Sequence, residues 1–267
     1  MTAAFEAPIF TEPCRICGGN LCESFKGLLL GDTPVRYAIC ADCKSLLLPS
    51  PHWLDRAYGI KLDVDPDFGD LRRCAFIHRT IRRMRALGLL PKHSRSLDFG
   101  SGKGILLRML LDDGQDAWGF DAYPNSAFAS ERVRKELPQG PFGLITLVEV
   151  IEHTVDPVSV LTQLRERLSD HGFLLLSTEL FDQAIHGPGW HYLAPELGQH
   201  VTIFSEQGLR KAASAAGLDW AGSLDFDHRS FVHLMIPKGS SLSRLALGRL
   251  RWRNRWGEHR AKRDSAI

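Results

Sequence analysis

The sequence contains no apolar run long enough to cross a membrane. Stretches such as Leu28-Leu29-Leu30 are short, whereas a spanning helix needs about 20 apolar residues. The first residues, Met1 to Glu6, have neither the basic region nor the long apolar core of a secretory signal peptide. These absences argue against a secreted or membrane-spanning protein, and we expect a cytoplasmic one.

Cysteine is also scarce, with six residues in a chain of 267. Nothing marks the protein as secreted, so a framework of disulfides is not expected. Four cysteines form two pairs separated by 22 residues, and they are Cys14, Cys17, Cys40 and Cys43. The two-residue gap within each pair lets both thiolates reach one tetrahedral ion, which is typical of a zinc ribbon. We expect a structural zinc ion, because a module of about 50 residues has too little core to be stable alone. Free or redox-active thiols are the alternative.

The composition, 44% hydrophobic and 24% charged, is that of a globular chain with one full core and a small accessory module. Acidic residues are nearly missing near the end, where Arg244 to Arg263 contains eight Lys or Arg residues and one Glu. Leucine and tryptophan interleave with these charges. Such a tail suits an anionic membrane surface, nucleic acid or an acidic partner, and a solvated terminus is the alternative. We expect a zinc-ribbon-like module at 1–55, a linker at 56–72, a catalytic domain at 73–237 and a basic tail at 238–267.

A glycine-rich turn lies between a short apolar strand and a helix, and it lacks two familiar nucleotide-binding patterns. The turn reads Ser96-Leu97-Asp98-Phe99-Gly100-Ser101-Gly102-Lys103-Gly104. A P-loop needs glycine where Leu97 stands, and a dinucleotide fingerprint needs glycine where Ile105 stands. Alternate glycines still allow a ligand to approach the main chain at the electropositive start of a helix. A purely structural turn is the alternative.

Asp121 ends a second short strand, 21 residues after Gly100. In doubly wound sheets an acidic residue about 20 residues beyond the glycine turn accepts hydrogen bonds from ribose hydroxyls. Its alternative role is to cap the following helix.

A third feature is the apolar run Leu144 to Val148, which suits a strand buried on both faces. Glu149-Val150-Ile151-Glu152-His153 follows, and then Asp156-Pro157 suits the first turn of a helix. Together with the glycine turn and Asp121, these segments resemble in order the motifs of class I S-adenosylmethionine (SAM) dependent methyltransferases.

This resemblance covers residues 96–157. It implies an α/β fold with a Rossmann-like sheet of seven mostly parallel strands. The third strand should be short or missing, because only 20 residues separate Asp121 from Phe142. The resemblance also implies that SAM is the cofactor and is bound by Asp98, Gly100, Ser101, Gly102, Gly104, Asp121 and Glu149.

The segment from Glu179 to Phe204 is rich in aromatic and titratable residues. Two parts of it, Trp190 to Pro195 and Gln199 to Ser205, resemble the acceptor-side segment of small-molecule and sugar methyltransferases from bacterial glycan or natural-product clusters. This implies a lid over a small-molecule or sugar acceptor, which is methylated at oxygen or, alternatively, at carbon. The candidate catalytic residues are His153, His191, Tyr192 and His200. An aromatic plug that only packs over the sheet is the alternative.

The segment Glu149-x-x-Glu152-His153 also resembles the metal-binding segment of RNA 3′-end and quinone-precursor O-methyltransferases. In those enzymes a later histidine is a further ligand, a role that His200 would fill. A catalytic divalent ion is therefore an alternative. If the Glu149 side chain points to solvent, it is not a ligand of such an ion. The alternative functions are an RNA methyltransferase that grips RNA with the zinc module and the tail, and a non-catalytic binding or scaffold protein.

Overall fold

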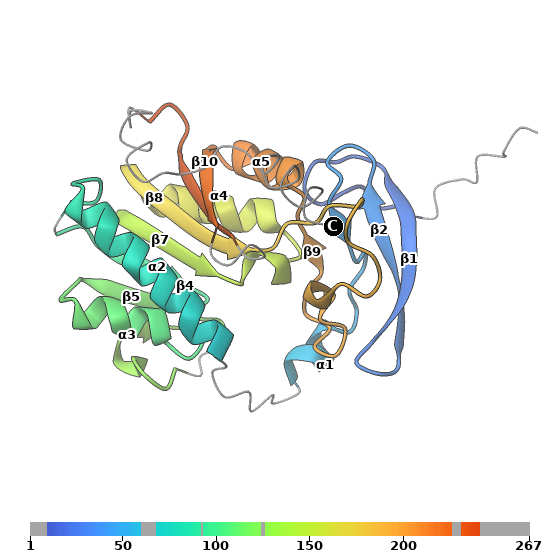
Figure 1. Ribbon diagram of the computed structural model, residues 1–267, viewed down its shortest axis with the longest axis horizontal. Coiled ribbons are helices and arrows are strands. Elements are labelled where there is room, and N and C mark those ends of the chain that lie inside the picture. Colours follow the sequence, from blue (N-terminus) through green and yellow to red (C-terminus); the bar gives the residue numbers. More distant parts are fainter. Residues whose placement is uncertain (1–9, 60–67, 92, 124–125, 226–230, 241–267) are drawn as a thin grey trace, which may run out of the picture. The chain divides into compact units, whose positions relative to one another are not determined.

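The chain folds into two compact units, described by a computed structural model for residues 10–59, 68–91, 93–123, 126–225 and 231–240 (Figure 1). Unit 1 consists of Met1–Asp65, Glu149–Gln163 and Thr178–Ala216, and unit 2 consists of Pro66–Val148, Leu164–Ser177 and Gly217–Ile267. No helix in the described part of the chain is long and apolar enough to cross a membrane. The charged part of the basic tail lies outside the described residues. Its partners therefore stay a prediction, as do the expected domain limits.

Unit 2 is built on a seven-stranded sheet with the strand order β10-β11-β8-β7-β4-β5-β6 (Figure 1). Strand β4 pairs in parallel with β5 and β7, β7 with β8, and β5 with β6, whereas β10 and β11 are antiparallel. The predicted Rossmann-like, mostly parallel sheet is therefore confirmed. The strands are β4 (Ser96–Phe99), β5 (Ala117–Phe120), β6 (Val133–Arg134), β7 (Phe142–Val148), β8 (Leu168–Thr178), β10 (Leu218–Asp225) and β11 (Phe231–Pro237).

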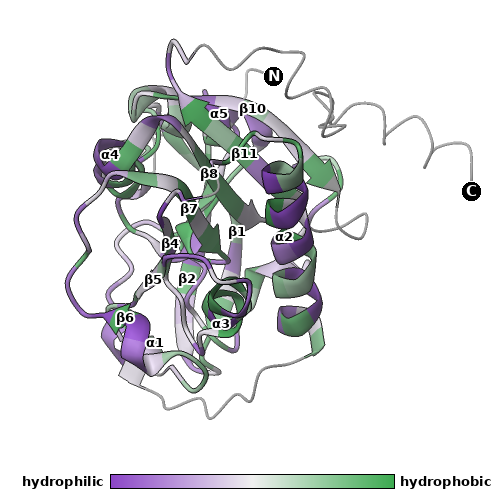
Figure 2. Ribbon diagram, turned by 90° about the vertical axis from the view of Figure 1, so that its left-hand side faces the viewer, coloured by the Kyte–Doolittle hydropathy of each residue, from purple (hydrophilic) through white to green (hydrophobic). Residues whose placement is uncertain are grey.

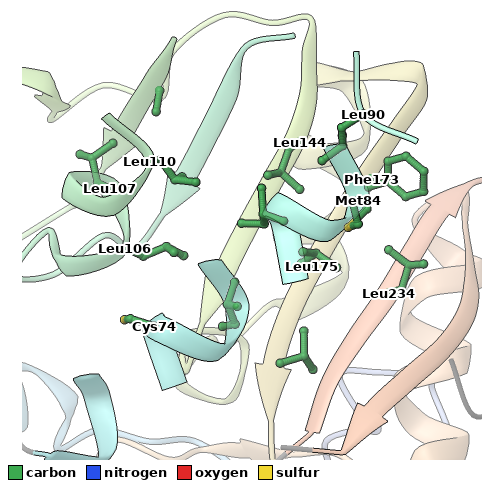
Figure 3. Packing of buried hydrophobic residues seen from close by; sticks show 14 of the residues in the cluster. Cys74, Met84, Leu90, Leu106, Leu107, Leu110, Leu144, Phe173, Leu175 and Leu234 are labelled. Carbon is green, nitrogen blue, oxygen red and sulfur yellow. The ribbon is translucent and has the colours of Figure 1, made fainter. Parts of the chain in front are cut away.

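Helices α2 (Phe68–Ala86) and α3 (Ile105–Asp112) share one apolar core with this sheet (Figure 3). On α2, the buried Ile77, Ile81 and Met84 recur at helical spacing, and arginines occupy other positions of the helix. Figure 2 shows the resulting apolar and polar sides of α2. Burial of each such side chain contributes about 1.5 to 3 kcal/mol to folding, so the core fixes the strands that lead into the glycine turn.

The third strand of the parallel series, β6, has only two residues and lies at the edge of the sheet. A single 3-10 turn, Ser130–Arg132, precedes it. This confirms the prediction of a short third strand.

One boundary differs from the sequence expectation. The apolar Leu161, Leu164 and Leu168 recur at helical spacing and predict a helix that ends near His171-Gly172. Helix α4 (Pro157–Arg167) ends earlier, and β8 begins at Leu168. Leu168 pairs with Phe142 at the start of β7. Sheet pairing has therefore overridden the helical pattern at the end of this segment.

Unit 1 contains a second, four-stranded sheet with the order β1-β2-β3-β9. Each of its three pairings is antiparallel. The strands are β1 (Leu21–Leu29), β2 (Thr33–Cys40), β3 (Leu46–Leu47) and β9 (Thr202–Ile203). The last strand comes from the segment expected to form a lid, so that segment supplies part of the same sheet as the cysteine pairs.

Unit 1 also contains helices α1 (Leu54–Gly59) and α5 (Glu206–Ala215) and most of α4, whose residues up to Gln163 belong to it. Helix α1 lies partly in the expected linker. Just before it, the buried Trp53 donates its indole hydrogen to the carbonyl oxygen of Gly198 at 2.8 Å. Helix α5 begins at Ser205, whose side chain accepts a hydrogen bond from the amide of Gly208 as an N-cap. These contacts fix Gly198, near the end of the segment from Glu179 to Phe204, and Ser205, which follows that segment.

Candidate functional site

The glycine turn in unit 2 has the backbone geometry that its sequence predicts. Gly100, Gly102 and Gly104 have φ angles of 70°, 49° and 82°, a region that side chains disfavour. At Gly104 a Cβ atom would also lie 2.5 Å from the Ser126 hydroxyl. The turn connects β4 with the start of α3, so its amides lie at a helix N-terminus that favours anionic or electron-rich ligand groups.

Asp121 lies at this turn, as expected from its place after β5, the neighbour of β4. One carboxylate oxygen accepts a hydrogen bond from the amide of Gly102 at 2.8 Å, and the other accepts one from the amide of Tyr123 at 2.8 Å. A carboxylate oxygen can accept more than one hydrogen bond. Asp121 therefore keeps acceptor capacity for a ligand hydroxyl, and its role with ribose stays a prediction.

Asp98 is the buried acidic residue of the turn. Its carboxylate accepts a hydrogen bond from the Thr146 hydroxyl at 2.7 Å. Burial raises the pKa of Asp98 to about 7, although the hydrogen bond from Thr146 opposes the shift. At neutral pH this side chain is therefore poised between its protonated and ionised forms.

This shift predicts a pH dependence of stability. In the unfolded chain Asp98 ionises near its usual pKa of 3.8, so between that pH and about 7 the folded state binds more protons. Its contribution to the free energy of unfolding should then fall as pH rises through this window, by up to about 4 kcal/mol. Urea denaturation at several pH values should show a smaller loss for Asp98→Asn than for the wild type. Identical slopes for the two proteins would contradict the raised pKa.

The four paired cysteines converge in unit 1, which supports the predicted zinc module. Their sulfur atoms all lie within 4.8 Å of one another, and those of Cys14 and Cys43 are 3.7 Å apart. The amide of Ile16 donates to the sulfur of Cys14 and that of Cys43 donates to the sulfur of Cys40, each at 3.4 Å. Four sulfurs at this spacing fit one tetrahedral zinc ion.

The electrostatics of this cluster also fit a cation. The hydrogen bond from the Cys14 thiol lowers the pKa of Cys43 to about 5, and hydrogen bonds from Ser45 add to the effect against the opposing influence of burial. The same bond and burial raise the pKa of Cys14. This lowering favours the thiolate of Cys43, which is the form that binds zinc.

A second polar cluster in unit 1 surrounds the buried Tyr192. Its phenolic oxygen lies 2.7 Å from a carboxylate oxygen of Glu152, 3.0 Å from one of Glu149 and 3.0 Å from the Thr178 hydroxyl. A phenol donates only one hydrogen, so two carboxylates compete for it. We call Tyr58, Glu149, Glu152, His153, Thr178, Tyr192 and His200 the tyrosine cluster.

Glu152 is completely buried, and its second carboxylate oxygen has no hydrogen-bond partner among the described residues. Burial and the nearby charge of Glu149 raise the pKa of Glu152 well above its usual value, although the hydrogen bond from Tyr192 opposes this. Glu149 has a φ angle of 53°, which is strained for a residue with a side chain and is often found at functional sites. The cluster therefore combines a buried carboxyl group at Glu152 with a strained backbone at Glu149.

Two histidines complete the cluster, with ring centroids 4.8 Å apart. Nδ1 of His200 donates to the carbonyl oxygen of Tyr192 at 2.6 Å, and Nδ1 of His153 is 3.3 Å from the Tyr58 hydroxyl. Burial lowers the pKa of His153 to about 3, and burial also lowers that of His200, where the Tyr192 carbonyl and the charge of Glu149 oppose the shift. Both imidazoles are therefore neutral, and Nε2 of His200 carries a lone pair.

An aromatic wall, made by Phe181, His186 and Trp190, precedes Tyr192. The rings of His186 and Trp190 are stacked, with centroids 4.0 Å apart and an angle of 2° between their planes, and the Phe181 and Trp190 centroids are 6.0 Å apart. The centroids of Trp190 and Tyr192 are 5.4 Å apart. The wall thus continues into the tyrosine cluster.

The structure brings together only some of the residues chosen from the sequence. His153, Tyr192 and His200 meet in the tyrosine cluster. His191 does not join them, because its side chain is 59% exposed and its Nε2 atom is 3.0 Å from Glu179. Glu149 hydrogen-bonds Tyr192, whereas its expected contact with SAM stays a prediction.

The sequence analysis missed Tyr58 and Thr178, and it considered Glu152 only as a metal ligand. Tyr58 and Thr178 belong to no motif and stand far from Tyr192 or His153 in the chain. For Glu152, the one available signal was an acidic residue set among the apolar Val150 and Ile151.

The family model described as "Methyltransferase domain" matches residues 71–221. No curated protein matches the chain. Among solved structures, the chain is similar to a SAM-dependent methyltransferase from Clostridium acetobutylicum ATCC 824, with 12% identity, a TM-score of 0.48, and coverage of 70% of this chain and 99% of that one. Magnesium protoporphyrin IX methyltransferase from Synechocystis PCC 6803, solved with bound SAH, has 16% identity, a TM-score of 0.47 and coverage of 70% and 95%.

The mitomycin 7-O-methyltransferase structure has 16% identity and a TM-score of 0.46, with coverage of 60% of this chain and 56% of that one. The chain thus spans little more than half the length of that relative. With TM-scores below 0.5 and identities of 12 to 16%, these likenesses carry no further conclusion about the chain. The family model, in contrast, matches more than half of the chain. The protein therefore belongs to the methyltransferase domain family, in agreement with the resemblance of its three sequence motifs to class I SAM-dependent methyltransferases.

Proposed function

We propose that this protein transfers a methyl group from SAM to a hydroxyl group of a small-molecule or sugar acceptor. Carbon methylation is the alternative. Unit 2 provides the proposed SAM site, with Gly100 to Gly104 and Asp121 supported by the left-handed glycine angles and the hydrogen bond between Gly102 and Asp121. Asp98 also belongs to this set, and Glu149, which belongs to unit 1, stays a prediction from the resemblance. SAM supplies an activated methyl group.

Methylation of a hydroxyl requires a place for its proton. As the new carbon–oxygen bond forms and the carbon–sulfur bond of SAM breaks, the proton must pass to a base. The observation that carries the proposal is the geometry of His200, whose Nδ1 hydrogen is held by the Tyr192 carbonyl at 2.6 Å. This fixes the tautomer, so that Nε2 of a neutral imidazole is the proton acceptor.

His200 is a better base than His153. Burial holds the pKa of His153 at about 3, so its protonated form is strongly disfavoured. The pKa of His200 is also lowered by burial, but the Tyr192 carbonyl and Glu149 favour its protonated form. A nearby carboxylate stabilises the imidazolium that forms when the acceptor loses its proton.

The aromatic wall supports an acceptor that contains a ring. The flat face of Trp190 is suited to stacking on a ring of such an acceptor, and the buried Phe181 packs behind it. Trp190 is only half-buried, which leaves part of its surface accessible. The polar tyrosine cluster beside it would orient hydroxyl groups of such an acceptor.

A second candidate mechanism uses a divalent cation. Glu152, His153 and His200 each offer a ligand atom, and these atoms lie within 4.8 Å of one another. The unpartnered oxygen of Glu152 favours this option, since a buried carboxylate without a partner is costly. Two imidazoles and a carboxylate suit a transition metal, which would supply a Lewis acid. In that case His200 would be a ligand and could not also be the base.

The proposal is tested by supplying the protein with methyl-labelled SAM and a panel of phenols, quinols and sugars, with short RNAs as a separate arm. We expect label on a ring hydroxyl of a small molecule. Label on RNA alone would contradict the proposal and favour the RNA methyltransferase. Retention of activity in a chelator that leaves the cysteine-bound zinc in place, checked by elemental analysis, would exclude the divalent-cation mechanism.

A further inference from the structure

The cysteine cluster and His200 are connected within unit 1 by a short antiparallel ladder. The turn that contains Cys43 leads directly into β3, and Leu46 and Leu47 pair with Ile203 and Thr202 of β9. The ladder continues one residue further, because the amide of Leu48 donates to the carbonyl oxygen of Val201 at 3.0 Å. His200 directly precedes Val201 in the chain. Only the paired residues of this ladder therefore lie between Cys43, a predicted zinc ligand, and His200, the proposed base.

Two buried serines fix the register of this ladder at its cysteine end. The amide of Ser205 donates to the Ser45 hydroxyl oxygen at 3.1 Å, and the Ser205 hydroxyl donates to the carbonyl oxygen of Cys43. The carbonyl oxygen of Ser45 accepts a hydrogen bond from the amide of Cys40 at 3.0 Å. Ser45 therefore links the second cysteine pair directly to Ser205, two residues beyond β9.

Helix α5 closes tightly on this contact. A Cβ atom at Gly208 would lie 1.9 Å from the Ser45 hydroxyl oxygen, so glycine is needed for the helix to approach. The amide of Gly208 donates to the Ser205 hydroxyl at 2.9 Å. No larger side chain fits between α5 and Ser45 without moving one of them.

The first cysteine pair holds the same ladder from another side. The guanidinium of Arg15, between Cys14 and Cys17, donates to the carbonyl oxygen of Leu48 at 2.8 Å and to the Thr202 hydroxyl at 3.3 Å. Both cysteine pairs are thus linked to β3 and β9. A shift of one residue in a strand pairing turns every side chain to the opposite face, and such a shift here would remove His200 from Tyr192.

We infer that Ser45 is a positioning residue for methyl transfer, because it couples the metal-loaded cysteine cluster to the register of β9 and so to the place of His200. This inference rests on the proposed role of His200. It gives the cysteine cluster a function in turnover beyond the stability of its own module. An imidazole misplaced by about 1 Å lowers a reaction rate by about 100-fold.

The test compares Ser45→Ala with Thr80→Ala, a control that also removes a buried hydroxyl but lies on α2 in unit 2. For Ser45→Ala we expect unchanged zinc content and SAM affinity, a kcat lowered by about 10- to 100-fold, and faster amide exchange at residues 200–203. Thr80→Ala should match the wild type in kcat and in exchange at these residues.

Gly208→Ala is a second variant. Its new methyl group on α5 would displace the Ser45 hydroxyl without contact with a cysteine, and alanine has a higher helix propensity than glycine. It should show the same lowered kcat and faster amide exchange at residues 200–203 as Ser45→Ala, with unchanged zinc content and SAM affinity. If Ser45→Ala does not fold, the result for Gly208→Ala tests the inference alone. Wild-type kcat and exchange in both variants would overturn the inference, as would a kcat that falls only in proportion to lost zinc. If His200→Ala turns over normally, the proposed base is wrong, while the exchange measurement still decides whether Ser45 sets the register.

Discussion

Replacing His200 by alanine should lower the rate of methyl transfer by about 10²- to 10⁴-fold, which is the range for loss of a general base. The affinity for SAM should stay unchanged, because His200 is not among the residues of the proposed SAM site, most of which belong to unit 2. Turnover with a labelled acceptor and calorimetric titration with SAM measure the two effects separately. At higher pH part of the lost rate should return, since hydroxide and a more ionised acceptor replace the missing base.

His171→Ala is a suitable control, because it removes an exposed histidine of β8 in unit 2. It should leave both turnover and SAM affinity at their wild-type values. A His200→Ala variant that turns over like this control would eliminate His200 as the base. An equal loss of SAM affinity and turnover would instead place His200 in the cofactor site.

The double variant Cys40→Ser, Cys43→Ser should lose its zinc and with it the fold of unit 1. Metal binding to structural sites of this kind contributes apparent free energies of about 10 kcal/mol or more, which exceeds the stability that a small core provides. Elemental analysis should find no bound zinc, and the amides of β1, β2, β3 and β9 should lose protection from exchange. Turnover should be lost because the tyrosine cluster belongs to the same unit.

Cys22→Ser provides the matched control, since Cys22 is exposed and lies outside the four-sulfur cluster. It should retain one zinc ion per chain and normal protection. Stoichiometric zinc in the double variant would show that these four sulfurs are not its ligands.

Local patterns were sufficient to predict the parts of the protein that depend on neighbouring residues. The alternate glycines predicted a turn because their φ angles are disfavoured for other residues, and the observed angles at Gly100, Gly102 and Gly104 confirm it. The paired cysteines predicted one cluster because a two-residue gap brings both sulfurs to the same side of a turn. The strand that ends before Asp121 placed that carboxylate at the turn, since adjacent parallel strands end at the same edge.

Contacts between distant residues were not visible in this way. Strand β9 pairs with β3 although positions 47 and 202 are far apart, and two-residue strands are too short to show a periodic pattern. Glu152 is a charged residue with complete burial, which composition alone does not predict. Only the fold shows that the Tyr192 phenol satisfies one of its oxygens and that His153 and His200 lie near its carboxylate.

The measurement that tests the central claim most directly is a calorimetric titration of the wild type and of Asp121→Ala with SAM. We expect the wild type to bind one SAM per chain and Asp121→Ala to bind it at least about tenfold more weakly, since charge-assisted hydrogen bonds to the ribose are lost. Circular dichroism and zinc content should confirm that both proteins are folded. A folded, zinc-loaded wild type that releases no heat with SAM, or an Asp121→Ala variant with unchanged affinity, would contradict the assignment of the glycine turn and Asp121 as the SAM site.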